Sequence, residues 1–183
     1  MLKLFETERL EALVVDERAA RQLLCYEKEN REHFAQFSPL RDDRYYTLGN
    51  VQKLCEKQAS LYKQERKLPL VFVRKGHSAI VATASLSDIT YGTLQSATLG
   101  YSTAQKWQRQ GIGSEAVKAT IDYAFDTLNL HRLEATIMTK NYPSLGFAES
   151  LGFVCEGIAR EYLFLHGKWE DYCRMALLGG REV

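Results

Sequence analysis

The sequence lacks an excess of charge of either sign. Its 183 residues include 24 lysines and arginines against 23 aspartates and glutamates, which leaves a formal net charge of +1 at pH 7. Proteins that bind nucleic acids or anionic membranes through their overall charge usually carry a strong positive balance. We therefore expect no direct contact with nucleic acid and none with a membrane surface.

Long hydrophobic runs are also missing. No stretch approaches the roughly 18 apolar residues of a membrane-spanning helix, and the opening residues Met-Leu-Lys-Leu-Phe-Glu-Thr-Glu-Arg lack the apolar core of a signal peptide. Repeats, linkers and low-complexity segments are absent as well. Because 45% of the residues are hydrophobic and 26% are charged, the composition is typical of a globular protein with a core. We expect a single cytoplasmic domain over residues 1–183.

The cysteines form no pattern that would bind a metal. Cys25, Cys55, Cys155 and Cys173 contain no C-x-x-C pair and have no histidine at zinc-ligand spacing, so no metal site is expected. In a reducing cytoplasm such residues are usually buried free thiols. We therefore predict four free thiols. None is expected to be a nucleophile, because none lies beside a motif that contains histidine.

A glycine-punctuated turn is the most informative segment present. It joins a strand-like run at 97–102 to apolar residues that recur at helical spacing over 116–128. The first backbone N–H groups of a helix are unpaired and lie at the positive end of its dipole, so they bind phosphate. Gly111 and Gly113 would let the backbone approach such an anion closely. The residues predicted to form the site are Gln108, Arg109, Gln110, Gly111, Ile112, Gly113 and Ser114.

This turn differs from two common phosphate-binding loops. It has no Gly-Lys-Ser or Gly-Lys-Thr ending, which excludes a P-loop. Its spacing is not Gly-x-Gly-x-x-Gly, and no acidic residue follows a second strand as in a dinucleotide-binding fold. Taken alone, the pattern also fits a turn whose glycines are purely structural.

The remaining pattern predicts an α+β order of elements, helices first and then strands that alternate with helices. Asp16 suits an N-cap and Gly152 a C-terminal cap, and residues 34–44 form a turn-rich connection. The predicted strands are 9–15, 70–73, 79–86, 95–102, 132–138, 153–157 and 169–177, and the predicted helices are 19–30, 47–67, 113–128 and 141–151.

Five short motifs, taken in order, resemble the GNAT acetyltransferase superfamily over about residues 8 to 178. They are Leu99-Gly-Tyr, Gln108-x-x-Gly-x-Gly, Leu130-His-Arg-Leu-Glu-Ala, Asn141-x-x-Ser and Leu151-Gly-Phe. The segments from Asn30 to Asp43 and from Gly167 to Asp171 resemble the branch that includes the bacterial ribosomal-protein-alanine N-acetyltransferases. The resemblance implies a GNAT-like mixed, mostly antiparallel sheet that is splayed after its fourth strand and flanked by helices. It also implies that acetyl-CoA, the co-substrate, enters the gap.

The resemblance implies roles for two further groups of residues. Backbone amides near Leu99, Gly100 and Tyr101 would face the gap and polarise the thioester carbonyl, and Gly100 suits a bulge that frees such an amide or serves in packing. Asn141 would hydrogen-bond the pantetheine arm, and Ser144 would protonate or bind the leaving thiolate. Helix capping is the alternative role for Asn141 and Ser144.

The sequence departs from the family at both usual acid–base positions. Many relatives have a glutamate before the Leu-Gly-Tyr run, where this chain has Thr98, and a tyrosine four residues after the serine, where it has Ala148. Glu134 and Glu161 remain candidate bases, with ion pairs to Arg132 or Arg160 as the alternative. We expect direct attack by the amine with deprotonation through water and no covalent enzyme intermediate. The predicted catalytic residues are Ser144 and Glu134.

The acceptor is expected to enter opposite the cofactor. An α-amine has a pKa of about 8, against about 10.4 for lysine, so a protein N-terminus needs a weaker base and fits this site. The alternatives are a small amine (an amino acid, a polyamine or an antibiotic) and a non-catalytic acyl-CoA-binding regulatory domain. A monomer or a homodimer is expected. The residues predicted to line the acceptor side are His33, Phe37, Arg41, Asp42, Tyr45, Tyr46 and Trp169.

Overall fold

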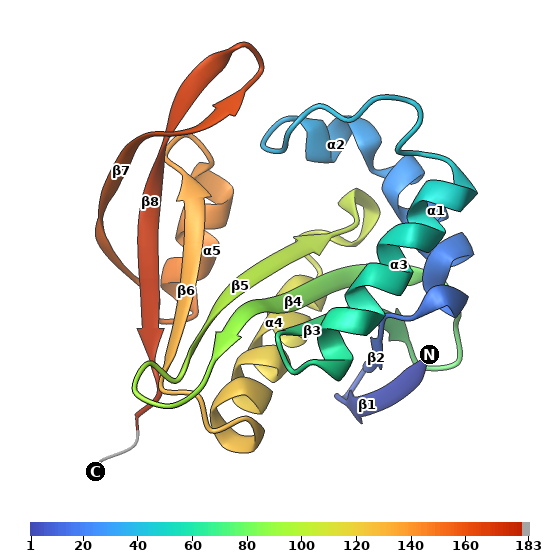
Figure 1. Cartoon of the computed structure of the whole chain (residues 1–183), viewed down its shortest axis with the longest axis horizontal. Helices are drawn as coiled ribbons and strands as arrows, with labels where there is room; N and C mark the ends of the chain where they lie inside the picture. The colour runs from blue at the N-terminus through green and yellow to red at the C-terminus, as the bar shows by residue number, and fades with distance from the viewer. Residues whose placement is uncertain (181–183) are drawn as a thin grey trace.

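An eight-stranded sheet runs through the computed structural model, which describes residues 1–180 (Figure 1). The strand order is β1-β2-β3-β4-β5-β6-β8-β7, and every neighbouring pair is antiparallel except β5 and β6. The strands are β1 (Leu2–Glu6), β2 (Leu10–Val14), β3 (Lys67–Arg74), β4 (Ile80–Thr90), β5 (Ser96–Thr103), β6 (Arg132–Met138), β7 (Val154–Leu165) and β8 (Lys168–Leu178). The predicted mixed, mostly antiparallel sheet is confirmed.

Helices cover both faces of this sheet. The longer helices are α1 (Ala20–Glu29), α3 (Leu48–Lys63), α4 (Ile112–Asp122) and α5 (Tyr142–Ser150). The shorter ones are η1 (Glu17–Ala19), α2 (Arg31–Ala35), η2 (Gln105–Trp107) and the π-helical turn η3 (Tyr123–Thr127). No helix among the described residues is long and apolar enough to cross a membrane.

Strand β3 shows how the two helical layers are separated. Leu70 and Phe72 pack in the same core as α4, whereas Val71 and Val73 pack in the core that contains α1 and α3. Successive side chains of a strand point to opposite faces, so the two cores lie on opposite sides of the sheet. Burial on both faces explains why residues 68–73 form a continuous apolar run rather than an alternating one.

The sheet opens between β5 and β6. Their pairing covers only residues 96–98 of β5, although that strand continues to Thr103. Figure 1 shows β6, β8, β7 and α5 on one side of the opening and β1 to β5 on the other. The predicted splay is confirmed, and the predicted fourth strand is β5 because β1 was not predicted.

Gly100 does not form the predicted bulge. It pairs with Ser85 in a register between β4 and β5 that is continuous from residue 82 to residue 87. The backbone of β5 is freed on its other side, where β6 has diverged. The prediction of a bulge was wrong because the loss of a neighbouring strand, rather than an extra residue, releases the backbone groups.

Most predicted elements are present, and the differences concern short or exposed segments. The strand β1 and the helix α2 each have five residues and were not predicted. The strand β7 continues to Leu165, although its prediction ended at residue 157. Its side chains are almost all exposed, and its pairing with β8 shifts register twice. Without a buried face, β7 has no hydrophobic alternation to reveal its length.

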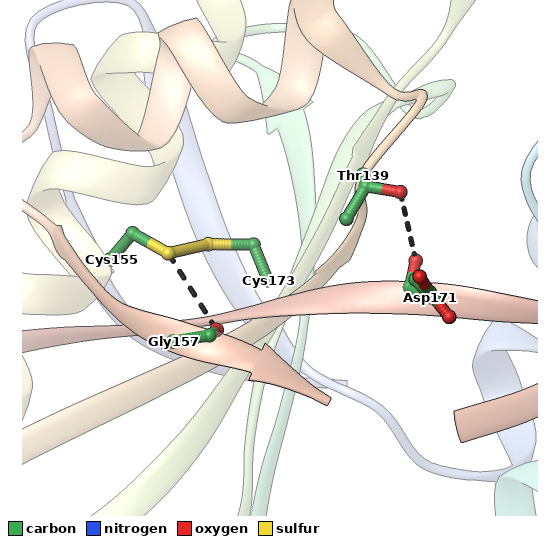
Figure 2. The surroundings of a disulfide bond; sticks show 5 residues. All are labelled: Thr139, Cys155, Gly157, Asp171 and Cys173. Atoms are coloured by element: carbon green, nitrogen blue, oxygen red, sulfur yellow. Dashed lines mark hydrogen bonds between the residues drawn. A yellow bond between two sulfur atoms is a disulfide. The ribbon is translucent and has the colours of Figure 1, made fainter. Parts of the chain in front are cut away.

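One pair of cysteines contradicts the prediction of free thiols. Cys155 of β7 and Cys173 of β8 form a disulfide, with their Cα atoms 6.2 Å apart (Figure 2). The prediction failed because the two residues meet only through the pairing of β7 with β8. Cys25 and Cys55 are free, as predicted, and burial raises the pKa of the Cys55 thiol to about 11. No cluster of three or more metal-ligating side chains is found within residues 1–180.

Candidate functional site

A cleft of about 1110 Å³ lies where β5 and β6 separate. It is bounded by α1, α2, the segment 36–46, the middle strands, the glycine turn and the start of α5. Nine of the predicted site residues line it: Gly100, Tyr101, Gln108, Arg109, Gly111, Gly113, Ser114, Asn141 and Ser144. The fold therefore brings the turn and the Asn141-x-x-Ser144 motif to one cavity.

The glycine turn presents backbone donors at the start of α4. The first helical hydrogen bond joins the amide of Glu115 to the carbonyl of Gly111 at 2.9 Å, so the amides of residues 112–114 precede the helical ladder. Among the described residues no side chain caps this helix. Arg109 and Gly111 both have positive φ values, 56° and 76°. Consecutive amides in such a turn, at the positive end of a helix dipole, suit an anion.

The two glycines of the turn are required for different reasons. At Gly111 the φ of +76° disfavours any other residue. At Gly113 an added Cβ would lie 2.6 Å from the Thr103 hydroxyl oxygen, so a side chain would push α4 away from β5. The structure thus gives Gly113 a packing role between helix and strand. Close approach of an anion remains a prediction for both glycines.

A partly buried carboxylate supports the turn from the side away from the cleft lining. Glu115 of α4 accepts hydrogen bonds from the Thr7 hydroxyl and from the backbone amide of Arg9, the latter at 2.8 Å. The Arg9 guanidinium also pairs with Glu115 and donates to the carbonyl of Gln110 at 3.0 Å. Burial alone would raise the pKa of Glu115, but the hydrogen bonds from Thr7 and Arg9 bring it below its usual value. This network ties the turn to the start of β2.

The other predicted turn and strand residues meet the cleft differently. The side chains of Leu99 and Ile112 are in the core, each only 3% exposed, so only their backbone groups can face a ligand. The side chain of Gln110 donates to the carbonyl of Lys106 at 2.8 Å. The side chain of Gln108 contacts the imidazole of His33, with 2.7 Å between the two Nε2 atoms. This contact links the turn to α2.

Two hydroxyl groups meet across the opening between β5 and α5. The Tyr101 hydroxyl lies 2.9 Å from the hydroxyl of Ser144 and 3.3 Å from its carbonyl oxygen. Burial raises the pKa of Tyr101 and the bond to Ser144 opposes that shift, so the phenol is protonated at neutral pH. The Oδ1 atom of Asn141 accepts the amide of Ser144 at 3.2 Å, which confirms its capping role. The Nδ2 group of Asn141 remains a potential donor to a ligand.

The backbone of β5 directs two amides to the opening. The amide of Ala104, just beyond β5, donates to the carbonyl of Val81 in β4 at 2.9 Å. Because the N–H groups of a strand alternate in direction, the amides of Tyr101 and Leu99 point the other way, towards β6. At Tyr101, β6 is no longer paired with β5.

The candidate bases are not brought together with Ser144. Glu134 of β6 lines a separate cavity of about 430 Å³ between β6, β7 and β8, where Arg132 binds it at 2.8 Å. The predicted alternative of an ion pair with Arg132 is therefore confirmed, and the geometry lends no support to a catalytic role. The backbone amide of Glu161 donates to the side chain of Asp171 at 2.8 Å, so Asp171 holds the two strands of the hairpin together. Figure 2 shows the carbonyl of Asp171 accepting from the Thr139 hydroxyl at 3.2 Å.

The opposite end of the cleft is built from side chains. Of the residues predicted there, the structure places His33, Phe37, Arg41, Tyr45 and Tyr46 in the cleft lining. Asp42 and Trp169 are not among the lining residues, and the side chain of Trp169 is 57% exposed. Its ring meets only Phe164 edge-on among the described aromatic residues.

Sequence reasoning missed a set of residues on α1 and β5. The hydroxyl of Ser102 lies 2.7 Å from the Tyr26 hydroxyl and 2.8 Å from the Thr83 hydroxyl. Glu27, next to Tyr26, lines the cleft. No short motif contains these residues, because the helix and the two strands meet only in the folded chain. A carboxylate flanked by tyrosine on a helix was the only available signal, and it also fits an ordinary surface position.

Comparison with known proteins agrees with this geometry. The family model described as the acetyltransferase (GNAT) domain matches residues 10–154. The chain belongs to the GNAT acetyltransferase family. Its fold is the GNAT fold, and the chain is accordingly an acetyl-CoA-dependent N-acetyltransferase. The non-catalytic alternative gains no support.

Three relatives illustrate the likeness. The chain is 39% identical to the probable N-acetyltransferase YjcK of Bacillus subtilis over 160 residues, 87% of this chain and 88% of that protein. The crystal structure of a ribosomal-protein-S5-alanine acetyltransferase from Vibrio fischeri superposes with a TM-score of 0.89, at 31% identity and 96% coverage of both chains. Mycobacterium smegmatis RimJ, in complex with a CoA disulfide, gives a TM-score of 0.86 at 26% identity, covering 92% of this chain and 81% of that one.

Proposed function

We propose that this GNAT enzyme transfers the acetyl group of acetyl-CoA to the N-terminal amine of a protein, with ribosomal proteins as the first class to test. The observation that carries the proposal is the cleft, which contains the anion-binding turn, the Tyr101–Ser144 hydroxyl pair and an aromatic loop. Similarity to a ribosomal-protein-alanine acetyltransferase directs the proposal to N-terminal amines.

The turn and Asn141 suit the two polar parts of the cofactor. The amides of residues 112–114 would hold the diphosphate at the positive end of α4, and the exposed Arg109 would add a charge. The Nδ2 group of Asn141 would donate to the pantetheine arm, because its Oδ1 atom is already used in capping. Among the described lining residues no carboxylate belongs to the turn, so nothing there would repel phosphate.

The reaction needs a polarised carbonyl and a stabilised leaving group. When bound, acetyl-CoA supplies an activated acetyl group as a thioester. The unpaired amide of Tyr101 would donate to the carbonyl oxygen as it gains negative charge, a contribution on the order of 3 kcal/mol. The protonated Tyr101 hydroxyl, paired with Ser144, would give its proton or a hydrogen bond to the departing sulfur. The amine would lose its proton to water and attack the carbonyl in its neutral form, and holding it against the carbonyl makes a covalent enzyme intermediate unnecessary.

The charge of the cleft favours an acceptor with one positive charge. The described lining contains Arg31, Arg41, Lys67 and Arg109 but only one carboxylate, that of Glu27. A polyamine carries several ammonium groups and would need several carboxylates. A peptide N-terminus needs one, and its backbone carbonyls can accept from the arginines.

The test is the release of free CoA thiol from acetyl-CoA with a panel of acceptors. The panel contains peptides that begin with Ala, Ser or Met, free amino acids, spermidine and an aminoglycoside. We expect turnover with the peptides alone, and the preferred first residue then identifies the protein class. Turnover on a small amine without turnover on any peptide would overturn the proposal.

A further inference from the structure

The cleft contains a single carboxylate among its described lining residues, and it belongs to Glu27 of α1. Leu23, Glu27 and Arg31 follow one another at intervals of four residues and all line the cleft. Residues four apart share one face of a helix, so this face of α1, continued by Arg31 at the start of α2, looks into the cavity. The carboxylate is therefore part of the cleft wall rather than of the solvated helix surface.

The surroundings of Glu27 leave its carboxylate available to a ligand. Its side chain is only 18% exposed, and burial raises the pKa of the group, while Arg41 opposes that shift. Among the described residues its one hydrogen bond comes from Arg41, at a long 3.3 Å. A carboxylate can accept about four hydrogen bonds, so most of its capacity is unused.

The partner of Glu27, Arg41, is held by a second contact. Arg41 lies in the segment 36–47, which has no regular secondary structure, and its side chain is 38% exposed. Its guanidinium stacks over the ring of Tyr45 with 4.0 Å to the ring centroid. This stacking would keep Arg41 in place if an incoming cation took over the contact with Glu27.

The position of Glu27 is fixed by its neighbours in the helix. The Tyr26 hydroxyl bonds that of Ser102 on β5 at 2.7 Å. The carbonyl oxygen of the Asn30 side chain accepts the amide of Gln105 at 2.8 Å. The turn of α1 that carries Glu27 is thus tied at both ends to the part of β5 that has lost its β6 neighbour and to the residues just after it.

We propose that Glu27 binds the ammonium group of the acceptor and so selects an amine that carries a single positive charge. An N-terminal amine with a pKa of about 8 arrives mostly protonated at neutral pH, and a partly buried carboxylate in the cleft wall is its natural counter-ion. The inference rests on the proposed function, because it takes a protein N-terminus as the acceptor.

The test compares two glutamates of the same helix. Glu27→Gln removes the charge in the cleft, whereas Glu29→Gln removes the charge of an exposed residue that pairs with Lys106 at 3.0 Å and is not among the described cleft residues. We expect Glu27→Gln to raise the KM of an Ala-initiated peptide at least tenfold with the KM of acetyl-CoA unchanged. Glu29→Gln should change neither value. Glu27→Asp, which keeps the charge, should retain part of the peptide affinity.

A second measurement separates amine recognition from a structural role. The affinity of the peptide is compared with that of its des-amino analogue, in which a propionyl group replaces the first alanine, in the presence of CoA. The wild type should prefer the amine, and Glu27→Gln should lose that preference while melting at an unchanged temperature.

Each negative result has a distinct meaning. If the wild type acetylates the peptide and Glu27→Gln keeps both the KM and the preference for the amine, the inference is overturned and the proposed function stands. If the wild type acetylates no peptide, the proposed function falls and the role of Glu27 falls with it.

Discussion

The two ends of the cleft present different kinds of chemical group, backbone amides at one end and side chains at the other. At the end proposed for the cofactor the donors would be backbone amides of the turn before α4, where the lack of a side chain at Gly113 lets the helix pack close to Thr103. At the acceptor end the ligand would meet the side chains of Glu27, Arg41 and Tyr45. Backbone donors do not depend on the identity of a side chain, so the cofactor end can be kept while substitutions at the other end change the acceptor.

The two ends of the cleft also differ in the contacts that fix their position. The turn lies between a strand and a helix that both belong to the main core. The segment 36–47 has no helix or strand and is tied by ring contacts and ion pairs, such as Arg31 with Tyr46 and with Asp43. It crosses the opening through Phe37, which packs against Met138, Leu165 and Tyr172. Under the proposed function, acceptor specificity would therefore depend on the less regular part of the fold.

The largest effect should come from breaking the cofactor end at its backbone. We expect Gly111→Val to weaken acetyl-CoA binding about 100-fold or more, because hydrogen bonds to a charged group contribute about 1.5–3 kcal/mol each. The branched side chain opposes the φ of +76° and would turn the amides away. Isothermal titration calorimetry measures the affinity.

A matched control exists for the backbone strain. Gly76, in the turn between β3 and β4, has the same φ of +76° and lies outside the described cleft lining. Gly76→Val should lower the melting temperature without changing the affinity. Equal affinity in the two variants would show that the turn does not bind the diphosphate.

The second largest effect should be on turnover rather than on the binding of acetyl-CoA. We expect Tyr101→Phe to lower kcat about 30-fold, below the ~10²–10⁴ of a full general acid because the Ser144 hydroxyl remains. Acetyl-CoA affinity should stay within about twofold, since the ring is retained. Ser144→Ala should also lower kcat. The double variant should lower kcat by less than the product of the two single reductions, because the two hydroxyls form one pair.

Thiol-release kinetics supplies these values. Tyr123→Phe is the control, because Tyr123 stacks on Phe5 and is not among the described cleft residues. Wild-type kcat in Tyr101→Phe and in Ser144→Ala would leave both hydroxyls with a structural role only.

A smaller effect should follow from loosening the brace behind the turn. Glu115→Gln weakens the ion pair with Arg9, which holds the carbonyl of Gln110. We expect acetyl-CoA affinity to fall about fivefold, because the turn must then be ordered on binding, while kcat at saturation is unchanged. Glu6→Gln, which alters exposed ion pairs with Lys3 and Lys75, is the control. An unchanged affinity would mean that β5 and α4 alone fix the turn.

The smallest effect concerns pH and distinguishes the two ends directly. Burial raises the pKa of Glu27 above its usual 4.5, so protonation removes the carboxylate at a higher pH than in an exposed glutamate. The affinity of an unacetylated peptide in the presence of CoA should be full above that pKa and fall as the pH drops through it.

His33, Arg31, Arg41 and Lys67 are other charged or ionisable groups that line the same cleft. Glu27→Gln keeps all four residues, so any pH dependence that remains in this variant comes from groups other than the Glu27 carboxylate. If the pH profile of Glu27→Gln matches that of the wild type, the Glu27 carboxylate is not the source of the pH dependence.

Local signals in the sequence were sufficient for much of the fold. The run at 132–138 has alternating apolar residues, and it forms β6 with those bounds. Asp16 caps η1, and Gly152 ends α5 with a φ of +92°, as their residue types predicted. The segments that were missed or mistaken are short or exposed, as in β1, α2 and the end of β7, where burial imposes no periodicity.

The sequence by itself determined the turn, because a glycine pattern between a strand and a helix specifies its backbone locally. It also determined the pairing of Asn141 with Ser144, since the two residues are one helical turn apart. Only the tertiary structure decided which partners those residues meet. The hydroxyl of Tyr101 beside Ser144, the bond between Cys155 and Cys173, and the place of Glu27 in the cleft join residues far apart in the chain. Such contacts depend on strand order and on the divergence of β5 from β6, which no short segment encodes.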